Sequence, residues 1–298
     1  MSTTKLRSPI QYFGGKFLLS KKLIQYVPQH KYYLEVFGGA ANLLLAKHKV
    51  PFEVYNDIDG DLVNFFRVLR DKEKFEEFYH QVQLMPVSRE EFYYCKENYG
   101  KQNDEIKRAV MWYYYARNSF FGKTKNASFG YSKTEINRNL PSSVSKWLSI
   151  IDLLPEIHKR IMQVQIEHLD WKDCLDKYNW GENEKSFTYL DPPYVPSTRK
   201  SGEYKYEMSE YGHSQLVDYL IKNFKPDSKN KFAMLSGYDN EIYKKLEENG
   251  WYKLKFNVDC PTARGACKLD ELDEYEYEEK YRREEVIWLN YSVESLIF

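Results

Sequence analysis

Short apolar runs with strand-like composition recur along the chain, and helical patterns separate them. The runs that predict strands cover residues 32–37, 52–56, 164–169, 187–191, 231–236 and 284–291, with 252–258 as a further candidate. Helical periodicity is found in "ANLLLAKH" after the first run and in "NEIYKKLEENG" after the fifth. This alternation predicts an α/β domain with a largely parallel sheet.

One long interval breaks the alternation. Residues 62–161 carry helical periodicity and aromatic clusters, as in "LVNFFRVLRDKEKFEEFYHQV" and "EIKRAVMWYYYARNSFF", but no convincing buried strand. We therefore predict that residues 1–61 and 162–298 form one α/β domain. Residues 62–161 would be a mostly helical insertion between the two halves of its sheet.

The composition is typical of a globular protein without a membrane span. Of the 298 residues, 30% are charged, and the mean hydropathy is −0.70. No apolar run reaches about 18 residues, and the N-terminus lacks the apolar core of a signal peptide, so we expect a cytoplasmic protein without membrane contact. The four cysteines are scattered without a CxxC pair, which predicts neither a metal site nor a disulfide framework.

Charge is balanced overall but unevenly distributed. Lysine plus arginine equals aspartate plus glutamate at 44 each, so the net charge does not indicate nucleic-acid binding. Residues 101–140 hold eight basic and three acidic side chains and are rich in Tyr, Phe, Asn and Ser. Residues 267–285 hold nine acidic and four basic side chains, which is typical of a solvated helix face.

Two features suggest a nucleoside site. In "YYLEVFGGAANLLLAK", Phe37, Gly38 and Gly39 form a turn between strand and helix at which a ligand can approach the backbone closely. Asp57 lies at the end of the next strand, 20 residues after Phe37, where doubly wound folds hold ribose hydroxyls. A plain turn and a helix N-cap are the alternative interpretations, and there is no GxGxxG dinucleotide motif.

A third strand end carries "LDPPY". Pro192 and Pro193 fix two φ angles and remove two donors, so the loop is stiff and presents acceptors, the Asp191 carboxylate and backbone carbonyls. Tyr194 adds a flat ring. This set suits a planar ligand with an exocyclic amino group, the alternative being a proline turn with a capped acid. Near the N-terminus, "QYFGGKFLLS" is another glycine turn, whose Lys16 could neutralise a ligand carboxylate.

The segments "YFGGK", "EVFGGAANLLLA", "YNDID" and "YLDPPY", in this order, resemble the Dam-type (alpha-class, D12) DNA adenine-N6 methyltransferases. The resemblance extends over nearly the whole chain, through "RNSFFGKTKNASFGYSK", "AMLSGYDNEIYKKL" and "EEVIWLNY". DPPY alone is shared with other amino-methylating enzymes, whereas the ordered set is much more specific. In one departure, Ala41 stands where family members usually have Gly or Ser, which puts the fine geometry of that turn in doubt.

The resemblance implies S-adenosylmethionine as cofactor, a Rossmann-like methyltransferase sheet and a DNA target-recognition role for residues 62–161. The implied cofactor-binding residues are Tyr12, Lys16, Phe37, Gly38, Gly39, Asp57, Ile58 and Asp191. The implied catalytic residues are Asp191, Pro192, Pro193 and Tyr194. As a mechanistic hypothesis, the Asp191 carboxylate and the Pro192 carbonyl accept hydrogen bonds from the adenine amino group, and Tyr194 stacks on the flipped base.

The expected partner is double-stranded DNA, contacted by the basic stretch "ARNSFFGKTKNASFGYSK" as a hairpin or loop. The candidate DNA-binding residues are Arg117, Asn118, Lys123, Lys125, Asn126, Tyr131 and Lys133. Phe120, Phe121 or Tyr131 could fill the gap left by the flipped base, or these rings could form the insertion's own core. GATC is only a family-level guess for the recognition sequence.

Other functions stay open at this stage. They are methylation of cytosine N4 or of adenine in RNA, a non-catalytic DNA-binding homologue, and a nucleoside-binding dehydrogenase. Cytosine-N4 enzymes usually carry Ser in place of Asp191, and the intact motifs argue against decay of the site. We expect a monomer in solution, and a cognate restriction endonuclease is a conceivable partner.

Overall fold

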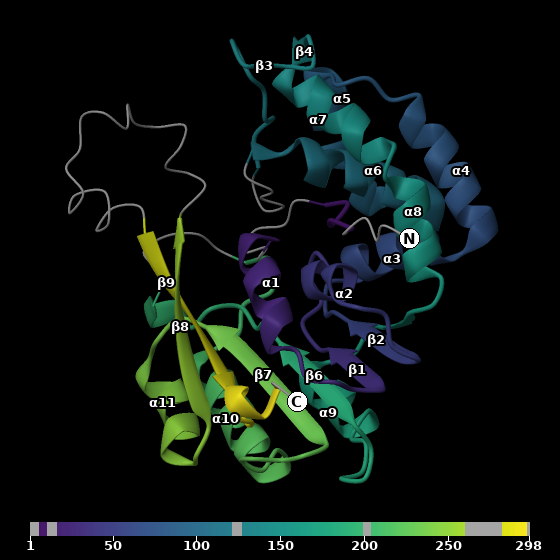
Figure 1. Ribbon diagram of the computed structural model, residues 1–298. Coiled ribbons are helices and arrows are strands. Elements are labelled where there is room, and N and C mark those ends of the chain that lie inside the picture. Colours follow the sequence, from purple (N-terminus) through teal and green to yellow (C-terminus); the bar gives the residue numbers. More distant parts are fainter. Residues whose placement is uncertain (1–5, 11–16, 121–126, 199–203, 260–281, 297–298) are drawn as a thin grey trace, which may run out of the picture.

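The computed structural model describes residues 6–10, 17–120, 127–198, 204–259 and 282–296. Its centre is a seven-stranded sheet in the order β5-β2-β1-β6-β7-β9-β8 (Figure 1). The strands are β1 (Tyr32–Glu35), β2 (Phe52–Asn56), β5 (Gln165–Glu167), β6 (Ser186–Leu190), β7 (Lys231–Gly237), β8 (Tyr252–Asp259) and β9 (Arg282–Leu289). Every apolar run that predicted a strand is therefore confirmed.

Five neighbouring strands are parallel, and β9, which lies between β7 and β8, runs in the opposite direction. β1 pairs in parallel with β2 and β6, β2 with β5, and β6 with β7, whereas β9 is antiparallel to both β7 and β8. All five residues of β6 are buried, because helices cover both faces of the central strands. The Rossmann-like, largely parallel α/β fold expected from the sequence is confirmed.

Alternation along the strands divides the apolar side chains into two layers. Tyr33, Tyr55 and Phe187 point into a core with α1 (Phe17–Leu23) and α2 (Asn42–Ala46). On the same three strands, Leu34, Val54 and Leu190 point to the other face of the sheet and into a second core. Three helices cover that second core: α9 (Trp171–Lys177), α10 (Glu210–Asn223) and α11 (Glu241–Glu248).

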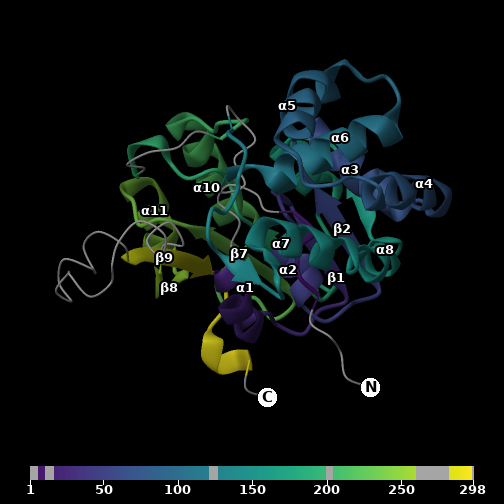
Figure 2. The same ribbon diagram turned by 90° about the horizontal axis from the view of Figure 1, so that it is seen from above.

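Helices also fill the chain between β2 and β5, and Figures 1 and 2 show them gathered at one side of the molecule, away from α10 and α11. They are α3 (Gly60–Arg70), α4 (Lys72–Gln83), α5 (Arg89–Asn98), α6 (Glu105–Asn118), α7 (Ser142–Ile151) and α8 (Leu154–Ile161). Rings such as Phe65, Trp112 and Tyr113 pack among them, and this core is continuous with the α1–α2 side of the sheet.

Two local features of this helical part differ from the sequence pattern. The helix-like run 62–82 is two helices, because the Asp71 side chain accepts a hydrogen bond from the Lys74 amide and so starts α4 as its N-cap. A short hairpin joins β3 (Ile136–Asn137) to β4 (Leu140–Pro141). Its turn residues Arg138 and Asn139 have φ values of 54° and 59°, as a tight two-residue turn requires.

The basic stretch 116–133 was expected to be a hairpin or loop, and its two arms do pair. Ser119 forms an antiparallel bridge with Phe129, and the Phe120 amide donates to the Ser128 carbonyl at 2.9 Å. Residues 121–126 between the arms lie outside the described part. Among the described helices, none combines the length and apolarity needed to cross a bilayer.

Candidate active site

A cleft of about 510 Å³ opens at the carboxyl ends of β1, β2 and β6. This is the edge at which open α/β sheets bind ligands. It brings together eight residues singled out from the sequence, although they come from three separate segments. They are Phe37, Gly38, Gly39, Asp57, Ile58, Asp191, Pro192 and Pro193.

The glycine turn after β1 is bonded to the end of β2. The Gly38 amide donates to the Asn56 carbonyl at 2.8 Å, and a Cβ on Gly38 would lie 2.1 Å from the Tyr55 ring. Gly39 has a φ of 48°, in the region that favours glycine. Ala41, which departs from the family pattern, adopts a φ of 54° and is fully buried. The turn therefore depends on the absence of a side chain at Gly38 and tolerates a methyl group at Ala41.

Asp57 bridges this turn to the start of α3. Its Oδ2 accepts from the Gly39 amide at 2.8 Å, and its Oδ1 accepts from the Asp59 amide at 2.8 Å. Burial raises the pKa of Asp57 to about 6, while these amide bonds oppose the shift. The N-cap of α3 is Asp59, which accepts from the Asp61 amide at 3.0 Å, so the helix-cap alternative does not apply to Asp57.

The sequence did not single out Glu35, which also lines the cleft. It is 2% exposed, and its Oε2 accepts from the Tyr33 hydroxyl at 2.7 Å and from the Leu44 amide at 3.0 Å. Burial raises the pKa of Glu35 to about 8. An acid inside the apolar run "YYLEVF" is the signal that could have revealed it.

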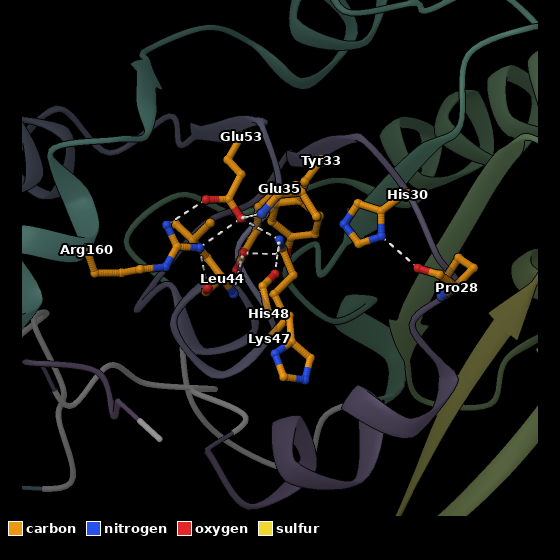
Figure 3. Close-up of polar contacts among 10 residues, drawn as sticks. Pro28, His30, Tyr33, Glu35, Leu44, Lys47, His48, Glu53 and Arg160 are labelled. Atoms are coloured by element: carbon orange, nitrogen blue, oxygen red, sulfur yellow. Dashed lines mark hydrogen bonds and ion pairs between the residues drawn. The ribbon is translucent and has the colours of Figure 1, made fainter. Parts of the chain in front are cut away.

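A buried ionic cluster lies beneath the turn, next to Glu35 (Figure 3). Lys47 lies 2.5 Å from one Glu53 oxygen, and Arg160 lies 2.6 Å from the other. Arg160 also donates to the Leu44 carbonyl at 3.0 Å. Burial lowers the pKa of Lys47 to about 8, and the Glu53 carboxylate opposes the shift. The cluster thus connects α2, β2 and α8. Through Arg160 it holds α2, the helix that follows the glycine turn, against α8.

The catalytic loop predicted from DPPY leaves β6 beside the end of β7. Asp191 is half-buried, and its Oδ1 accepts from the Ser236 hydroxyl at 3.1 Å. Ser236 itself is completely buried and lies 3.1 Å from the Tyr189 hydroxyl. Ser236 was not predicted, although its place at the end of an apolar strand is a signal of the kind that pointed to Asp191. The Asp191 carboxylate is thereby oriented at the mouth of the cleft.

Tyr194 is placed differently from the other three residues of the motif. It is 8% exposed and is not among the described residues that line the cleft. Its hydroxyl lies 2.9 Å and 3.1 Å from the two carboxylate oxygens of Glu285. Its ring packs on Tyr238 with a centroid distance of 4.1 Å, and Tyr204 lies edge-on at 6.2 Å. The ring is therefore held from several sides.

The opposite wall of the cleft is a segment that follows the catalytic loop in the chain, residues 204–209. Lys205 in this segment lies 2.7 Å from Asp59 and 2.7 Å from Asp61, and Arg108 of α6 lies 2.6 Å from Asp61. Burial by itself would lower the pKa of Lys205, but the two carboxylates raise it above its ordinary value. These ion pairs fasten the segment to the start of α3.

The predicted DNA-binding residues divide into three groups. Tyr131 and Lys133 are exposed, and the Tyr131 ring lies 4.8 Å from the Arg89 guanidinium. Asn118 is 6% exposed and donates to the Tyr114 carbonyl at 3.0 Å, and burial lowers the pKa of Arg117. The third group lies outside the described residues: Lys123, Lys125 and Asn126, as do the predicted cofactor contacts Tyr12 and Lys16.

Most described aromatic side chains of residues 62–161 are packed in the core that these helices share with the α1–α2 side of the sheet. Phe129 packs against Phe92 at 5.5 Å, and Tyr115 packs against Tyr99 at 5.8 Å. Among the rings considered for the space of a flipped base, Phe120 is 50% exposed and Tyr131 is 52% exposed. Phe121 lies outside the described residues. Phe120 and Tyr131 are therefore the half-exposed rings among the described candidates.

A doubly wound sheet with a ligand cleft at the carboxyl ends of its strands, an acid at the second strand and Asp-Pro-Pro-Tyr at the fourth parallel strand defines a Rossmann-like methyltransferase. Residues 12–258 match the sequence model of the D12 class N6 adenine-specific DNA methyltransferases, and the chain belongs to this family. Its activity is adenine-specific methylation of DNA.

Three relatives are similar to this chain over most of their own length. The type II methyltransferase M.MjaIII of Methanocaldococcus jannaschii is 26% identical over 296 residues, covering 90% of this chain and 96% of that protein. The DNA adenine methylase of Serratia marcescens is 21% identical over 264 residues, covering 84% and 88%. The type II methyltransferase M1.LlaDCHI of Lactococcus lactis subsp. cremoris is 27% identical over 261 residues, covering 81% and 84%.

Proposed function

We propose that the chain transfers a methyl group from S-adenosylmethionine to N6 of an adenine that is flipped out of duplex DNA. The observation that carries the proposal is that the Asp191 carboxylate lies in the same cleft as the glycine turn and Asp57. The glycine turn and Asp57 can thus hold a nucleoside, and the Asp191 carboxylate can hold an amino group beside it.

The cleft fits such a cofactor in size and in chemistry. Its volume of about 510 Å³ is typical of small-molecule sites. The Asp57 carboxylate accepts two amide bonds and keeps lone pairs for ribose hydroxyls. Gly38 and Gly39 leave the backbone open to the methionine part, and Ile58, 44% exposed, offers an apolar surface to the adenine ring. When bound, the cofactor supplies an electrophilic methyl group on sulfonium.

The chain's own contribution to the reaction is orientation. The lone pair of adenine N6 is delocalised into the ring, which makes this nitrogen a weak nucleophile. Hydrogen bonds from the amino group to the Asp191 carboxylate and the Pro192 carbonyl favour a tetrahedral nitrogen whose lone pair points at the methyl group. Ser236 donates to Asp191 Oδ1 and so fixes the carboxylate plane. Positive charge that develops on nitrogen is stabilised by the same acceptors.

The target base must leave the duplex to reach this loop, at a cost of a few kcal/mol that contacts with DNA offset. We infer that the basic stretch 116–133 supplies these contacts, with Lys133 and Tyr131 on its exposed arm. We further propose that the enzyme acts as a monomer in the cytoplasm. Because two relatives are named type II methyltransferases, it would pair with a cognate restriction endonuclease.

Asp191→Ala tests the mechanism. Removing the acceptor should lower methyl transfer to duplex DNA by roughly a thousandfold or more, while S-adenosylmethionine still binds measurably. Transfer is measured with a tritiated methyl donor on duplex DNA, RNA and protein, and the product nucleoside is identified as N6-methyladenine or N4-methylcytosine by chromatography. Asp173→Ala, an exposed acid on α9, is the matched control. Full activity of Asp191→Ala would contradict the mechanism.

A further inference from the structure

The antiparallel end of the sheet contacts the catalytic loop at one particular point. Gly237 of β7 pairs with Val286 of β9, so the adjoining residues Tyr238 and Glu285 lie side by side where the two strands separate. Both contact Tyr194, which lies 91 residues before Glu285 in the sequence. The last residue of the DPPY motif is therefore held by residues that belong to neither the glycine turn nor the catalytic loop.

The contact with Glu285 is well formed. The Tyr194 hydroxyl lies 2.9 Å from one carboxylate oxygen and 3.1 Å from the other, and both residues are 8% exposed. Hydrogen bonds to an ionised acceptor are stronger than neutral ones, and the scarcity of water around this pair strengthens the bond further. The Tyr238 ring supports the Tyr194 ring at a centroid distance of 4.1 Å, so both the hydroxyl and the plane of the ring are fixed.

We propose that Glu285 is a positioning residue for methyl transfer, which fixes the ring of Tyr194 through its hydroxyl and thereby sets the plane of the target adenine relative to Asp191. The inference rests on the proposed function, because only a reaction on a stacked base needs this ring to be fixed. Loss of the contact removes the anchor of the Tyr194 hydroxyl and lets the loop 191–194 shift, although Tyr238 still contacts the ring. A misaligned amino group reacts more slowly even when base and cofactor are bound.

A double-mutant cycle tests the proposal, with Glu285→Ala, Tyr194→Phe and the combined variant. Each single change removes the same hydrogen bond, so kcat should fall roughly 10- to 100-fold in each. The combined variant should be no slower than the slower single variant. KM for DNA and the Kd for S-adenosylmethionine should stay within about twofold. Glu285→Gln keeps an acceptor for the hydroxyl and should regain most of the activity.

Glu284→Ala is the matched control, since Glu284 is the exposed neighbour on β9, paired with Lys255 at 2.7 Å, and its loss should leave kcat unchanged. Fluorescence of 2-aminopurine at the target position reports stacking directly and should be less quenched in Glu285→Ala than in the wild type. Effects that multiply in the combined variant, or unchanged kcat and fluorescence in Glu285→Ala, would overturn the inference. An inactive wild-type chain on DNA would instead refute the proposed function.

If Glu285→Ala unfolds, as thermal denaturation would show, the pair Tyr194→Phe and Glu285→Gln still decides the question. Glu285→Gln must then be faster than Tyr194→Phe, because only the tyrosine variant lacks the hydroxyl. Equal rates in these two variants would overturn the proposal.

Discussion

If Asp57 holds the ribose of S-adenosylmethionine as proposed, the affinity for the cofactor should depend on pH. Burial raises the pKa of Asp57 to about 6, and the ionised form is the one that accepts hydrogen bonds from ribose hydroxyls. Below pH 6 the protonated fraction grows, so the Kd for S-adenosylmethionine should rise by about tenfold per pH unit and level off above pH 7. Isothermal titration calorimetry between pH 5 and pH 8 measures this dependence.

Asp57→Asn is the control for this titration. It should bind the cofactor more weakly at pH 8 and show a flat profile between pH 5 and pH 7. Glu35, whose pKa is raised to about 8, titrates above this range and does not account for the slope. A wild-type Kd that is constant from pH 5 to pH 7 would contradict the ribose role of Asp57.

The raised pKa of Asp57 also affects stability, which changes with pH in the opposite direction to the expected cofactor affinity. The folded state holds the Asp57 proton more tightly than the unfolded state, where the pKa is close to 4. The contribution of this group to the free energy of unfolding is therefore fully present below about pH 4, and it falls as the pH rises through about 6. The proposed ribose contact thus needs the ionised form of Asp57, which burial disfavours.

Sequence reasoning located some site residues and missed others for a physical reason. Gly38, Asp57 and Asp191 follow apolar strands directly, and the local chain pattern alone places them at the carboxyl edge of the sheet. Lys205 and Glu285 depend on partners 146 and 91 residues away, Asp59 and Tyr194. Charged residues in surface-like segments carry no local sign that they will meet a buried partner.

At the scale of elements, the predictions succeeded for strands whose side chains are buried in the core. The central strands β1, β2, β6 and β7 were recognisable because they are covered on both sides, which requires apolar runs. The β3–β4 hairpin was missed because its Ile136 is 76% exposed and it has only two residues in each strand. The sequence sign of the hairpin is its turn, "NRN", and these residue types occur equally in loops without strands.

The segment 204–209 should control release of the cofactor, because it forms one wall of the cleft and is fastened by Lys205. In Lys205→Ala the ion pairs with Asp59 and Asp61 are lost, and the dissociation rate of S-adenosylmethionine should rise by about tenfold. Stopped-flow fluorescence measures this rate. Lys225→Ala removes an exposed pair with Glu182 and should have no effect. An unchanged dissociation rate in Lys205→Ala would show that the segment does not restrain the cofactor.

At the scale of the whole molecule, the order of the strands brings the three parts of the site together. β1 lies between β2 and β6, so the ends that carry the glycine turn, Asp57 and Asp191 are neighbours. The sequence predicted the parallel sheet, but strand order depends on pairings between distant segments, and the antiparallel placement of β9 between β7 and β8 had no local signal. The buried cluster of Lys47, Glu53 and Arg160 likewise forms only when the insertion packs on the sheet.

The zero net charge of the chain does not locate its DNA-binding surface, whereas a salt titration of matched variants can. The described arms of the stretch, residues 116–120 and 127–133, begin at the end of α6, and Figure 1 shows α11 far from α6. If Lys123 and Lys125 each neutralise one phosphate, replacing both by Ala should weaken DNA binding and reduce the slope of log K against log salt by about 2. Fluorescence anisotropy between 50 and 200 mM salt is the measurement.

Lys244→Ala with Lys245→Ala, two exposed lysines on α11, is the control with the same change in net charge. If binding depended only on the net charge of the chain, the two double variants would lose affinity equally. If the basic stretch is the DNA surface, only the first pair changes the slope, because counterions are released where phosphates are contacted. Equal slopes in both pairs would move the DNA interface away from residues 116–133, while the methyl-transfer chemistry of the cleft would be unaffected.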